Sequence, residues 1–358
     1  MSALIEKKLK PVVITCGDPA GIGIDVLLKF LAKNEKKIGK SLRPAVLVCP
    51  EDIVFERAEI LGKKCISALE RLVSRKKLRF VPPVENKELE NKRIEPGKPS
   101  IITGMIAYES IVKAHELIKS EEAIAMITLP ISKEWVSKYL KESGREKEAE
   151  SFKGHTEFLA NLCGTTMPIM VLANPKLKVA LYTTHMALKD VPGTLRKEGA
   201  EKLREFLLVL MREANALWGP VKIGVAGLNP HAGEGGKFGT EEIEIIKPAL
   251  EELPKTVFSG PHPSDTIFWK AINGEFDLVV AFYHDQGIIP VKTLDFYNGV
   301  NITLNLPYIR TSPDHGTAYD IAGTGKAHPG SMEMAYTWAS KLSNYKNPFK
   351  FFRYMNPS

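Results

Sequence analysis

The chain has 358 residues, of which 44% are hydrophobic and 25% are charged, and its formal net charge is +7 at pH 7. This length suffices for about two domains that each bury their own core, and no apolar run approaches the roughly 18 residues of a membrane span. We therefore expect a two-domain enzyme rather than a membrane protein.

The basic residues and the cysteines bear on partners and compartment. The basic segments 7–10, 33–40 and 75–79 are short and lack the interleaved aromatic residues of a nucleic-acid groove, although a positive field would steer anionic small substrates. The four cysteines lie far apart and form no C-x-x-C pair, and the start, MSALIEKKLKPVVIT, has no signal-peptide core. The sequence predicts a cytoplasmic protein with no nucleic-acid or membrane partner and no disulfide framework.

A strand, a glycine-rich turn and a helix are predicted near the N-terminus. Residues 11–15 form a short apolar run, and CGDPAGIGIDVLLKFLAK follows it. Gly17, Gly21 and Gly23 do not fit G-x-G-x-x-G, and no P-loop motif occurs, so both common nucleotide-binding fingerprints are missing. The turn has two interpretations: a tight turn with Asp18 near a helix start, or a ligand cradle.

Further strands and helices follow. Residues 45–49 and 123–128 are predicted to be buried strands, and residues 104–118 have the apolar spacing of a packed helix. His155 and Thr156 directly precede an apolar helical stretch, so Thr156 is a candidate helix cap whose neighbouring N–H groups could also bind an anion.

Three histidines repeat one placement. VALYTTH, IGVAGLNPH and LVVAFYH put His185, His231 and His284 just after three strand-like runs separated by helical patterns. If these strands belong to one parallel sheet, all three imidazoles emerge at its carboxyl edge. Three histidine ligands leave open positions on a divalent ion, which is typical of a catalytic metal.

The segment 281–332 gathers polar side chains in turns directly after an apolar run. Such groups are costly to order unless a ligand uses them, so the segment is a candidate site. Its notable members are His284, Asp285, Lys292, Asn301, Arg310, Asp314 and His315. Upstream, Asp265 in GPHPSDTIF is either a helix-start residue or an active-site carboxylate.

Seven segments occur in order along almost the whole chain: GDPAGIG, GHTEFLA, TTHMALKDVP, GLNPHAGEGG, GPHPSDTIF, YHDQGIIPVK and GVNITLNLPYIRTSPDHGTAYDIAGTGKA. Together they resemble the successive signatures of the 4-hydroxythreonine-4-phosphate dehydrogenase family of vitamin B6 (pyridoxine) biosynthesis. DHGTAYDIAGTGKAHP is also similar to the cofactor loop of isopropylmalate dehydrogenases.

The resemblance implies an α/β fold like that of isocitrate and isopropylmalate dehydrogenases, which bind NAD without a Rossmann domain, with the active site in the interdomain cleft. It implies a discontinuous cofactor-side domain, residues 1–130 plus 311–358, and a domain for metal, substrate and dimerisation, residues 131–310. It also implies a homodimer whose partners share their active sites.

Residue by residue, the resemblance assigns one divalent metal per site (Zn, Mg, Mn or Co) to His185, His231 and His284. It assigns the substrate to His155, Thr156, Lys292, Asn301 and Arg310. It assigns NAD, with NADP left open, to His315, Gly316, Asp320, Ala322, Gly323 and Gly325. Asp265 and Asp285 are the carboxylates expected to accept or orient a proton.

The implied reaction is metal- and NAD-dependent oxidation of 4-phosphooxy-L-threonine at C3, followed by decarboxylation to 3-amino-2-oxopropyl phosphate. The alternative within the family is a dehydrogenase of D-threonate or D-erythronate 4-phosphate, and the alternative from another class is a metal-dependent phosphatase. Three departures from the family pattern leave the substrate open: Ile24-Asp25 for Pro-Glu, Ser132 for Asn and Asn305 for Gly.

Overall fold

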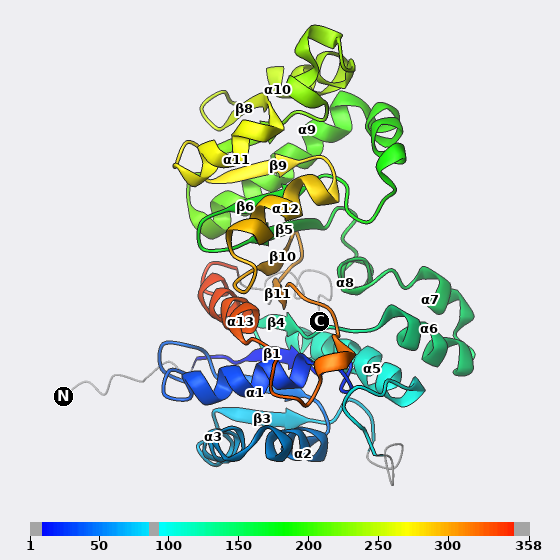
Figure 1. Ribbon diagram of the computed structural model, residues 1–358, viewed down its shortest axis with the longest axis vertical. Coiled ribbons are helices and arrows are strands. Elements are labelled where there is room, and N and C mark those ends of the chain that lie inside the picture. Colours follow the sequence, from blue (N-terminus) through cyan, green and yellow to red (C-terminus); the bar gives the residue numbers. More distant parts are fainter. Residues whose placement is uncertain (1–8, 86–92, 347–358) are drawn as a thin grey trace, which may run out of the picture. The chain divides into compact units, whose positions relative to one another are not determined.

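The computed structural model describes residues 9–85 and 93–346 and has mixed α/β structure in two compact units. Unit 1 comprises Met1–Leu159 and Pro307–Ser358, and unit 2 comprises Ala160–Leu306 (Figure 1). The helices that follow residue 130 pack onto unit 1, so the compact units divide after Leu159. The functional domain boundary expected at residue 130 stays a prediction. No helix in the described part of the chain is long and apolar enough to cross a membrane.

Unit 1 contains a parallel sheet with the strand order β3-β2-β1-β4-β11. The strands are β1 (Val12–Thr15), β2 (Ala45–Val48), β3 (Leu78–Val81), β4 (Ala125–Thr128) and β11 (Ile309–Pro313). Most are uniformly apolar and buried, as expected for parallel strands covered on both faces. The strands predicted at 11–15, 45–49 and 123–128 are confirmed, with ends that differ by one or two residues.

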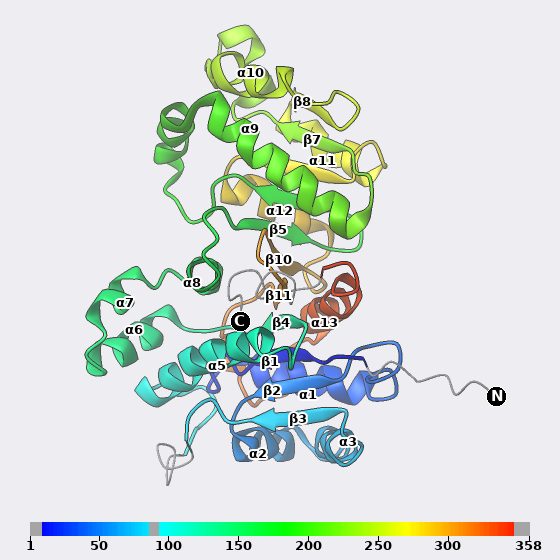
Figure 2. The same ribbon diagram turned by 180° about the vertical axis from the view of Figure 1, so that it is seen from behind.

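Helices cover both faces of this sheet: α1 and α13 lie on one face and α5 on the other (Figures 1 and 2). The helices of this unit are α1 (Gly23–Asn34), α2 (Glu51–Leu61), α3 (Lys63–Ser74), α5 (Ile101–Lys119), α6 (Lys133–Glu142), α7 (Glu146–Ser151), the short η4 (Tyr319–Ile321) and α13 (Gly330–Leu342), and α8 (His155–Leu162) begins in this unit and ends in unit 2. Cys16 and Cys49 follow β1 and β2, which pair in register, so two cysteines far apart in sequence have Sγ atoms 2.7 Å apart as buried free thiols.

Unit 2 contains a mixed sheet with the strand order β10-β5-β6-β9-β7-β8. The strands are β5 (Ile169–Ala173), β6 (Lys178–Leu181), β7 (Ile223–Ala226), β8 (Phe258–His262), β9 (Leu278–Ala281) and β10 (Val300–Leu304). The helical segments are η1 (Leu188–Asp190), α9 (Val191–Trp218), η2 (Pro230–Gly236), η3 (Glu242–Ile246), α10 (Lys247–Glu251), α11 (Ser264–Ile272) and α12 (His284–Leu294). As the histidine pattern predicts, β6, β9 and β7 are parallel neighbours.

Close packing of α5 on α6 explains why α6 belongs to unit 1. Gly104 of α5 faces the backbone of Trp135 in α6, and an added Cβ there would lie 2.2 Å from the Trp135 carbonyl oxygen. That distance is far inside van der Waals contact, and the obstacle is backbone, which cannot rotate away. A residue without a side chain is therefore required for this helix pair.

Gly104→Ala should lower the free energy of unfolding by about 1–3 kcal/mol, because the helices must move apart. Gly193→Ala is the matched control: Gly193 lies in α9, and an added Cβ would meet no atom within 4 Å. It should be neutral or stabilise by up to about 1 kcal/mol. Urea unfolding of both variants measures the difference, and equal stability would contradict the packing argument.

Candidate active site

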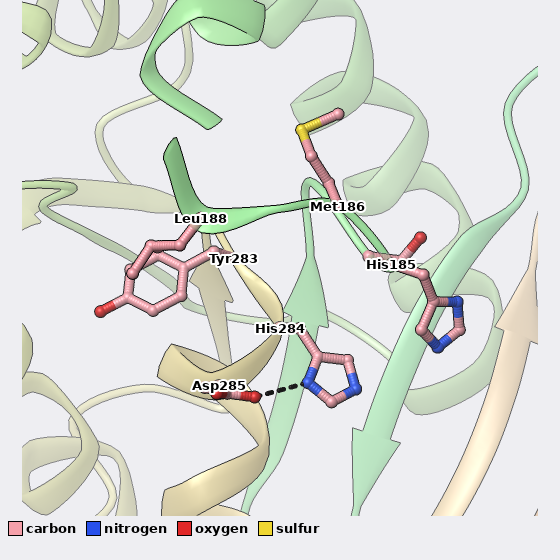
Figure 3. A pocket seen from close by; sticks show the side chains of 7 residues that line it. His185, Met186, Leu188, Tyr283, His284 and Asp285 are labelled. Atoms are coloured by element: carbon pink, nitrogen blue, oxygen red, sulfur yellow. Dashed lines mark hydrogen bonds and ion pairs between the residues drawn. The ribbon is translucent and has the colours of Figure 1, made fainter. Parts of the chain in front are cut away.

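Two histidines meet at the carboxyl ends of neighbouring parallel strands in unit 2. β6 pairs in parallel with β9, so the segments that follow them leave the sheet at the same edge. His185 follows β6, His284 begins α12 after β9, and their ring centroids lie 5.5 Å apart (Figure 3). They line a pocket of about 420 Å³ together with Thr184, Met186, Leu188, Tyr283 and Asp285.

Asp285 determines the tautomer of His284. Nδ1 of His284 lies 2.7 Å from Oδ1 of Asp285 (Figure 3). An ionised carboxylate only accepts hydrogen bonds, so Nδ1 donates and Nε2 keeps its lone pair. A carboxylate behind an imidazole in this way is typical of metal-binding histidines. The donor set of His185 and His284 therefore fits two ligands of a divalent ion.

His231 lies on a separate loop of the same unit, in η2 after β7. Its side chain is exposed, with Nδ1 3.4 Å from Oε2 of Glu234. In the described part of the chain, no three His, Cys, Asp or Glu side chains lie close enough to hold a metal ion. Within one chain, then, the structure brings together His185 and His284 but not His231.

A buried carboxylate holds the loop that carries His231. Oε1 of the fully buried Glu242 accepts from the backbone N–H of Asn229 at 2.7 Å, and its Oε2 accepts from the Asn229 amide at 2.9 Å. The loop contains His231 and Ala232 with φ of +53° and +51°, a region that L-residues rarely adopt. Such strained backbone persists where surrounding contacts hold it, so the loop that carries His231 has a defined conformation.

Gln286 joins the ends of β7 and β9 near the histidine pair. Its Nε2 donates to the carbonyl oxygen of Gly227 at 2.7 Å and to Oγ of Ser264 at 2.8 Å, and its Oε1 accepts from the N–H of Phe282 at 2.6 Å. Asp265, the next residue after Ser264, is exposed in the first turn of α11. The structure thus places Asp265 at a helix start, whereas Asp285 touches a predicted metal ligand.

A buried guanidinium and a buried imidazole nitrogen lie together in unit 1. Arg310 of β11 is 3% exposed and donates from Nε and Nη2 to Oγ1 of Thr128 at 3.0 and 2.6 Å. Burial lowers the pKa of Arg310 to about 10. Burial, and then the charges of Arg310 and Lys133, hold the pKa of His155 well below its usual value. Nε2 of His155 is buried with no hydrogen-bond partner in the structure, so this region is suited to an anion with hydroxyl groups.

The remaining predicted substrate residues are divided between the units. Thr156 is buried, but α8 begins at His155, so Thr156 lies in the first helical turn and is not the cap that was predicted; Gly154, with φ of +135°, precedes the helix. In unit 2, Lys292 is partly buried in α12, with Nζ 5.4 Å from the Phe296 ring centroid. Asn301 of β10 keeps a buried Oδ1 with no hydrogen-bond partner, a second polar atom that a ligand could satisfy.

The predicted cofactor residues lie in one turn of unit 1, residues 315–326, between β11 and α13. Nδ1 of His315 lies 3.0 Å from the Gly316 carbonyl oxygen. Gly316, Asp320 and Gly325 are exposed, Gly323 is partly buried and Ala322 is buried. An added Cβ on Gly316 or Gly325 would meet no atom within 4 Å, so a large ligand can approach this backbone.

The three departures from the family pattern have structural roles. Asp25 is fully buried and pairs with Arg57. Ser132 caps α6 by accepting from the N–H of Trp135 at 3.4 Å. Asn305 has φ of +61°, and Asn is among the residues that tolerate this conformation in place of Gly. None of them requires a change of substrate.

Comparison with known proteins identifies the family of this chain. A family model described as pyridoxal phosphate biosynthetic protein PdxA matches residues 43–339. The chain belongs to the PdxA family. The resemblance found in the sequence is thereby confirmed.

Several PdxA-family relatives match nearly end to end. A D-threonate 4-phosphate dehydrogenase of Pectobacterium atrosepticum is 39% identical, over 93% of this chain and 99% of the relative. A 4-hydroxythreonine-4-phosphate dehydrogenase of Geobacter metallireducens is 37% identical, over 94% of this chain and 96% of the relative. The crystal structure of a 4-hydroxythreonine-4-phosphate dehydrogenase from Klebsiella pneumoniae superposes with a TM-score of 0.76 at 34% identity, covering 93% of this chain and 99% of that one. The predicted α/β fold of this family is confirmed.

Sequence reasoning found some of the supporting residues but not their partners. It placed Gln286 beside His284 as a possible orienting group and Glu242 in a helix first turn, whereas both side chains bind backbone groups of other segments. Asp25 was noticed only as a departure from the family. A signal existed for Glu242 alone, since a carboxylate on the apolar side of a helix is costly to bury without partners.

The neutral state of His155 leads to a pH test. Its pKa is lowered in the folded protein, so below about pH 6.5 the unfolded chain takes up a proton that the folded protein does not, and stability is lost as the pH falls toward the folded pKa. His155→Gln removes this titration. Between about pH 7.5 and pH 5, its free energy of unfolding should fall by roughly 1–2 kcal/mol less than that of the wild type.

Urea unfolding at both pH values measures this difference. An unchanged pH dependence in His155→Gln would contradict a buried neutral imidazole.

Proposed function

We propose that the protein is an NAD-dependent dehydrogenase that oxidises 4-phosphooxy-L-threonine at C3 and decarboxylates the product to 3-amino-2-oxopropyl phosphate. The observation that carries the proposal is the His185–His284 pair, with Asp285 behind His284, in a member of the PdxA family. The reaction class is that named for its relatives.

His185 and His284 would hold a divalent ion through their ring nitrogens, with Asp285 keeping Nε2 of His284 available. When bound, such an ion lowers the pKa of a coordinated hydroxyl and polarises a ketone, which favours both hydride loss and decarboxylation. Asp285, exposed beside His284, is also close enough to the pocket to accept a proton from the substrate.

Arg310 would bind an anionic group of the substrate. It is a buried cation that donates to the hydroxyl of Thr128, and its planar guanidinium suits paired hydrogen bonds to a phosphate or carboxylate. His155 in the same unit would hydrogen-bond the ligand through Nε2, and Asn301 in unit 2 through Oδ1. Lys292 would add a second cation for the phosphate.

The turn of residues 315–326 would bind the nicotinamide nucleotide. Its exposed backbone at Gly316 and Gly325 permits close approach, and the neighbouring Thr324 and Lys326 supply a hydroxyl and a cation that suit phosphate. This role was assigned by resemblance to isopropylmalate dehydrogenases, and the open turn supports it.

We also propose that His231 completes the metal site from a second copy of the chain. Glu242 holds its loop through Asn229 and leaves His231 exposed, and no third ligand from the described residues of the same chain joins His185 and His284. A homodimer that exchanges these loops would supply three imidazoles to each site, the number expected of a catalytic metal.

A second candidate substrate is D-threonate 4-phosphate, because a relative of that name is 39% identical. It carries a hydroxyl where 4-phosphooxy-L-threonine carries an ammonium group. The two reactions share oxidation, decarboxylation and phosphate recognition, so the residues proposed above serve both.

NADH formation with each purified substrate, with and without divalent metal, tests the proposal. We expect metal-dependent NADH formation with 4-phosphooxy-L-threonine and a kcat/KM at least about tenfold lower with D-threonate 4-phosphate, the cost of one mispaired polar group. The reverse order would assign the second substrate. Phosphate release without NAD would indicate a phosphatase and contradict both.

Mixing two inactive variants tests the shared metal site. His231→Ala and His284→Ala should each be inactive, but their heterodimer has one site with all three histidines, so co-refolded equal mixtures should recover about a quarter of wild-type activity. His185→Ala mixed with His284→Ala is the control and should stay inactive, since both ligands come from one chain. Failure of the first mixture to recover would contradict the exchange of His231.

A further inference from the structure

We propose that α1 and the GDPAGIG turn before it form a support that positions the cofactor turn, residues 315–326, with Asp25 and Lys29 as positioning residues. This inference rests on the proposed function, because it takes the cofactor turn to be the nucleotide-binding segment. All of the residues involved belong to unit 1.

Asp25 joins α1 to the cofactor turn. Its carboxylate is fully buried; Oδ2 accepts the backbone N–H of Gly323 at 2.7 Å, and Oδ1 accepts from Nη1 of Arg57. Arg57 also donates to the carbonyl oxygens of Gly21 and Pro19 at 3.1 and 2.9 Å. The guanidinium of Arg57 thus neutralises the Asp25 carboxylate and connects it to the GDPAGIG turn. The other carboxylate oxygen, Oδ2, binds the backbone N–H of Gly323.

Lys29 makes a second connection from the same face of α1, four residues after Asp25. Its ammonium group donates to the carbonyl oxygen of Gly325 at 2.6 Å and to that of Ala327 at 2.7 Å. Two residues of one helix therefore hold the cofactor turn on both sides of Thr324. Gly323 and Gly325 have φ of +74° and +73°, so the turn between these contacts is intrinsically flexible chain.

The GDPAGIG turn supplies further connections. Ile22 donates its N–H to the carbonyl oxygen of Thr317 at 2.8 Å, and the hydroxyl of Tyr319 donates to Oδ2 of the buried Asp18 at 2.7 Å. A Cβ on Gly21 would lie 2.7 Å from the Thr317 carbonyl oxygen, so only glycine allows this approach. These contacts favour the tight-turn interpretation of the motif over a ligand cradle.

The physical consequence concerns affinity for the nucleotide. Ordering a flexible loop costs conformational entropy when a ligand binds, and contacts that order it beforehand reduce that cost. Asp25 and Lys29 touch the backbone of the cofactor turn and none of the predicted metal or phosphate ligands. Their loss should therefore weaken nucleotide binding while metal binding and substrate binding stay unchanged.

Lys29→Met tests the inference with little risk of unfolding, because the side chain lies near the surface and its stem is kept. We expect the Kd for NADH, measured by fluorescence titration, to rise about three- to tenfold. The KM for NAD should rise likewise, with kcat and metal content unchanged, and amides 323–327 should exchange hydrogen faster. Lys33→Met is the matched control, because Lys33 of the same helix pairs with Glu333 outside the turn, and it should bind NADH within about twofold of wild type.

Asp25 is tested by two substitutions. Asp25→Asn removes the charge facing Arg57 and should weaken NADH binding at least as much as Lys29→Met; Asp25→Glu keeps the charge and should recover part of the affinity. Wild-type affinity and wild-type exchange in Lys29→Met would overturn the positioning role. A wild-type protein that binds no NADH would instead overturn the proposed nucleotide site itself.

Discussion

The parallel pairing of β6, β9 and β7 is the constraint on which the candidate site depends. Parallel strands end at a common edge, so the residues that follow them converge whatever their separation in sequence. His185 and His284 meet for this reason, although they lie far apart in the sequence. Gln286 then ties the neighbouring end of β7 to the same helix, so the strand register and the histidine geometry are fixed together.

Buried polar atoms without a hydrogen-bond partner occur among the other predicted site residues. Most buried polar groups in proteins have partners, and an exception costs free energy that folding alone does not recover. His155 and Asn301 each keep one such atom, and burial lowers the pKa of Arg310. The resemblance to the family independently assigns the substrate to the same three residues. The agreement between unsatisfied atoms and that pattern supports a ligand for them more strongly than either observation does separately.

Residues that distinguish this chain from its family serve the scaffold. Asn305 adopts a left-handed backbone, Ser132 caps a helix, and Asp25 accepts hydrogen bonds from Arg57 and Gly323. Each residue suits its position: Asn305 tolerates a positive φ, Ser132 supplies a capping hydroxyl, and Asp25 supplies a carboxylate. A departure in sequence therefore need not signal a departure in chemistry, and its meaning depends on what the side chain touches.

The sequence by itself determined the class of fold, the main strands and the identity of the chemical groups. Apolar runs and glycine turns are local signals, and the ordered signatures identified the family. Only the tertiary structure decided that His231 lies apart from the histidine pair, that α6 and α7 belong to unit 1, and that Asp25 and Lys29 hold the cofactor turn. These facts depend on contacts between segments hundreds of residues apart or on backbone groups, and neither leaves a periodic pattern in the sequence.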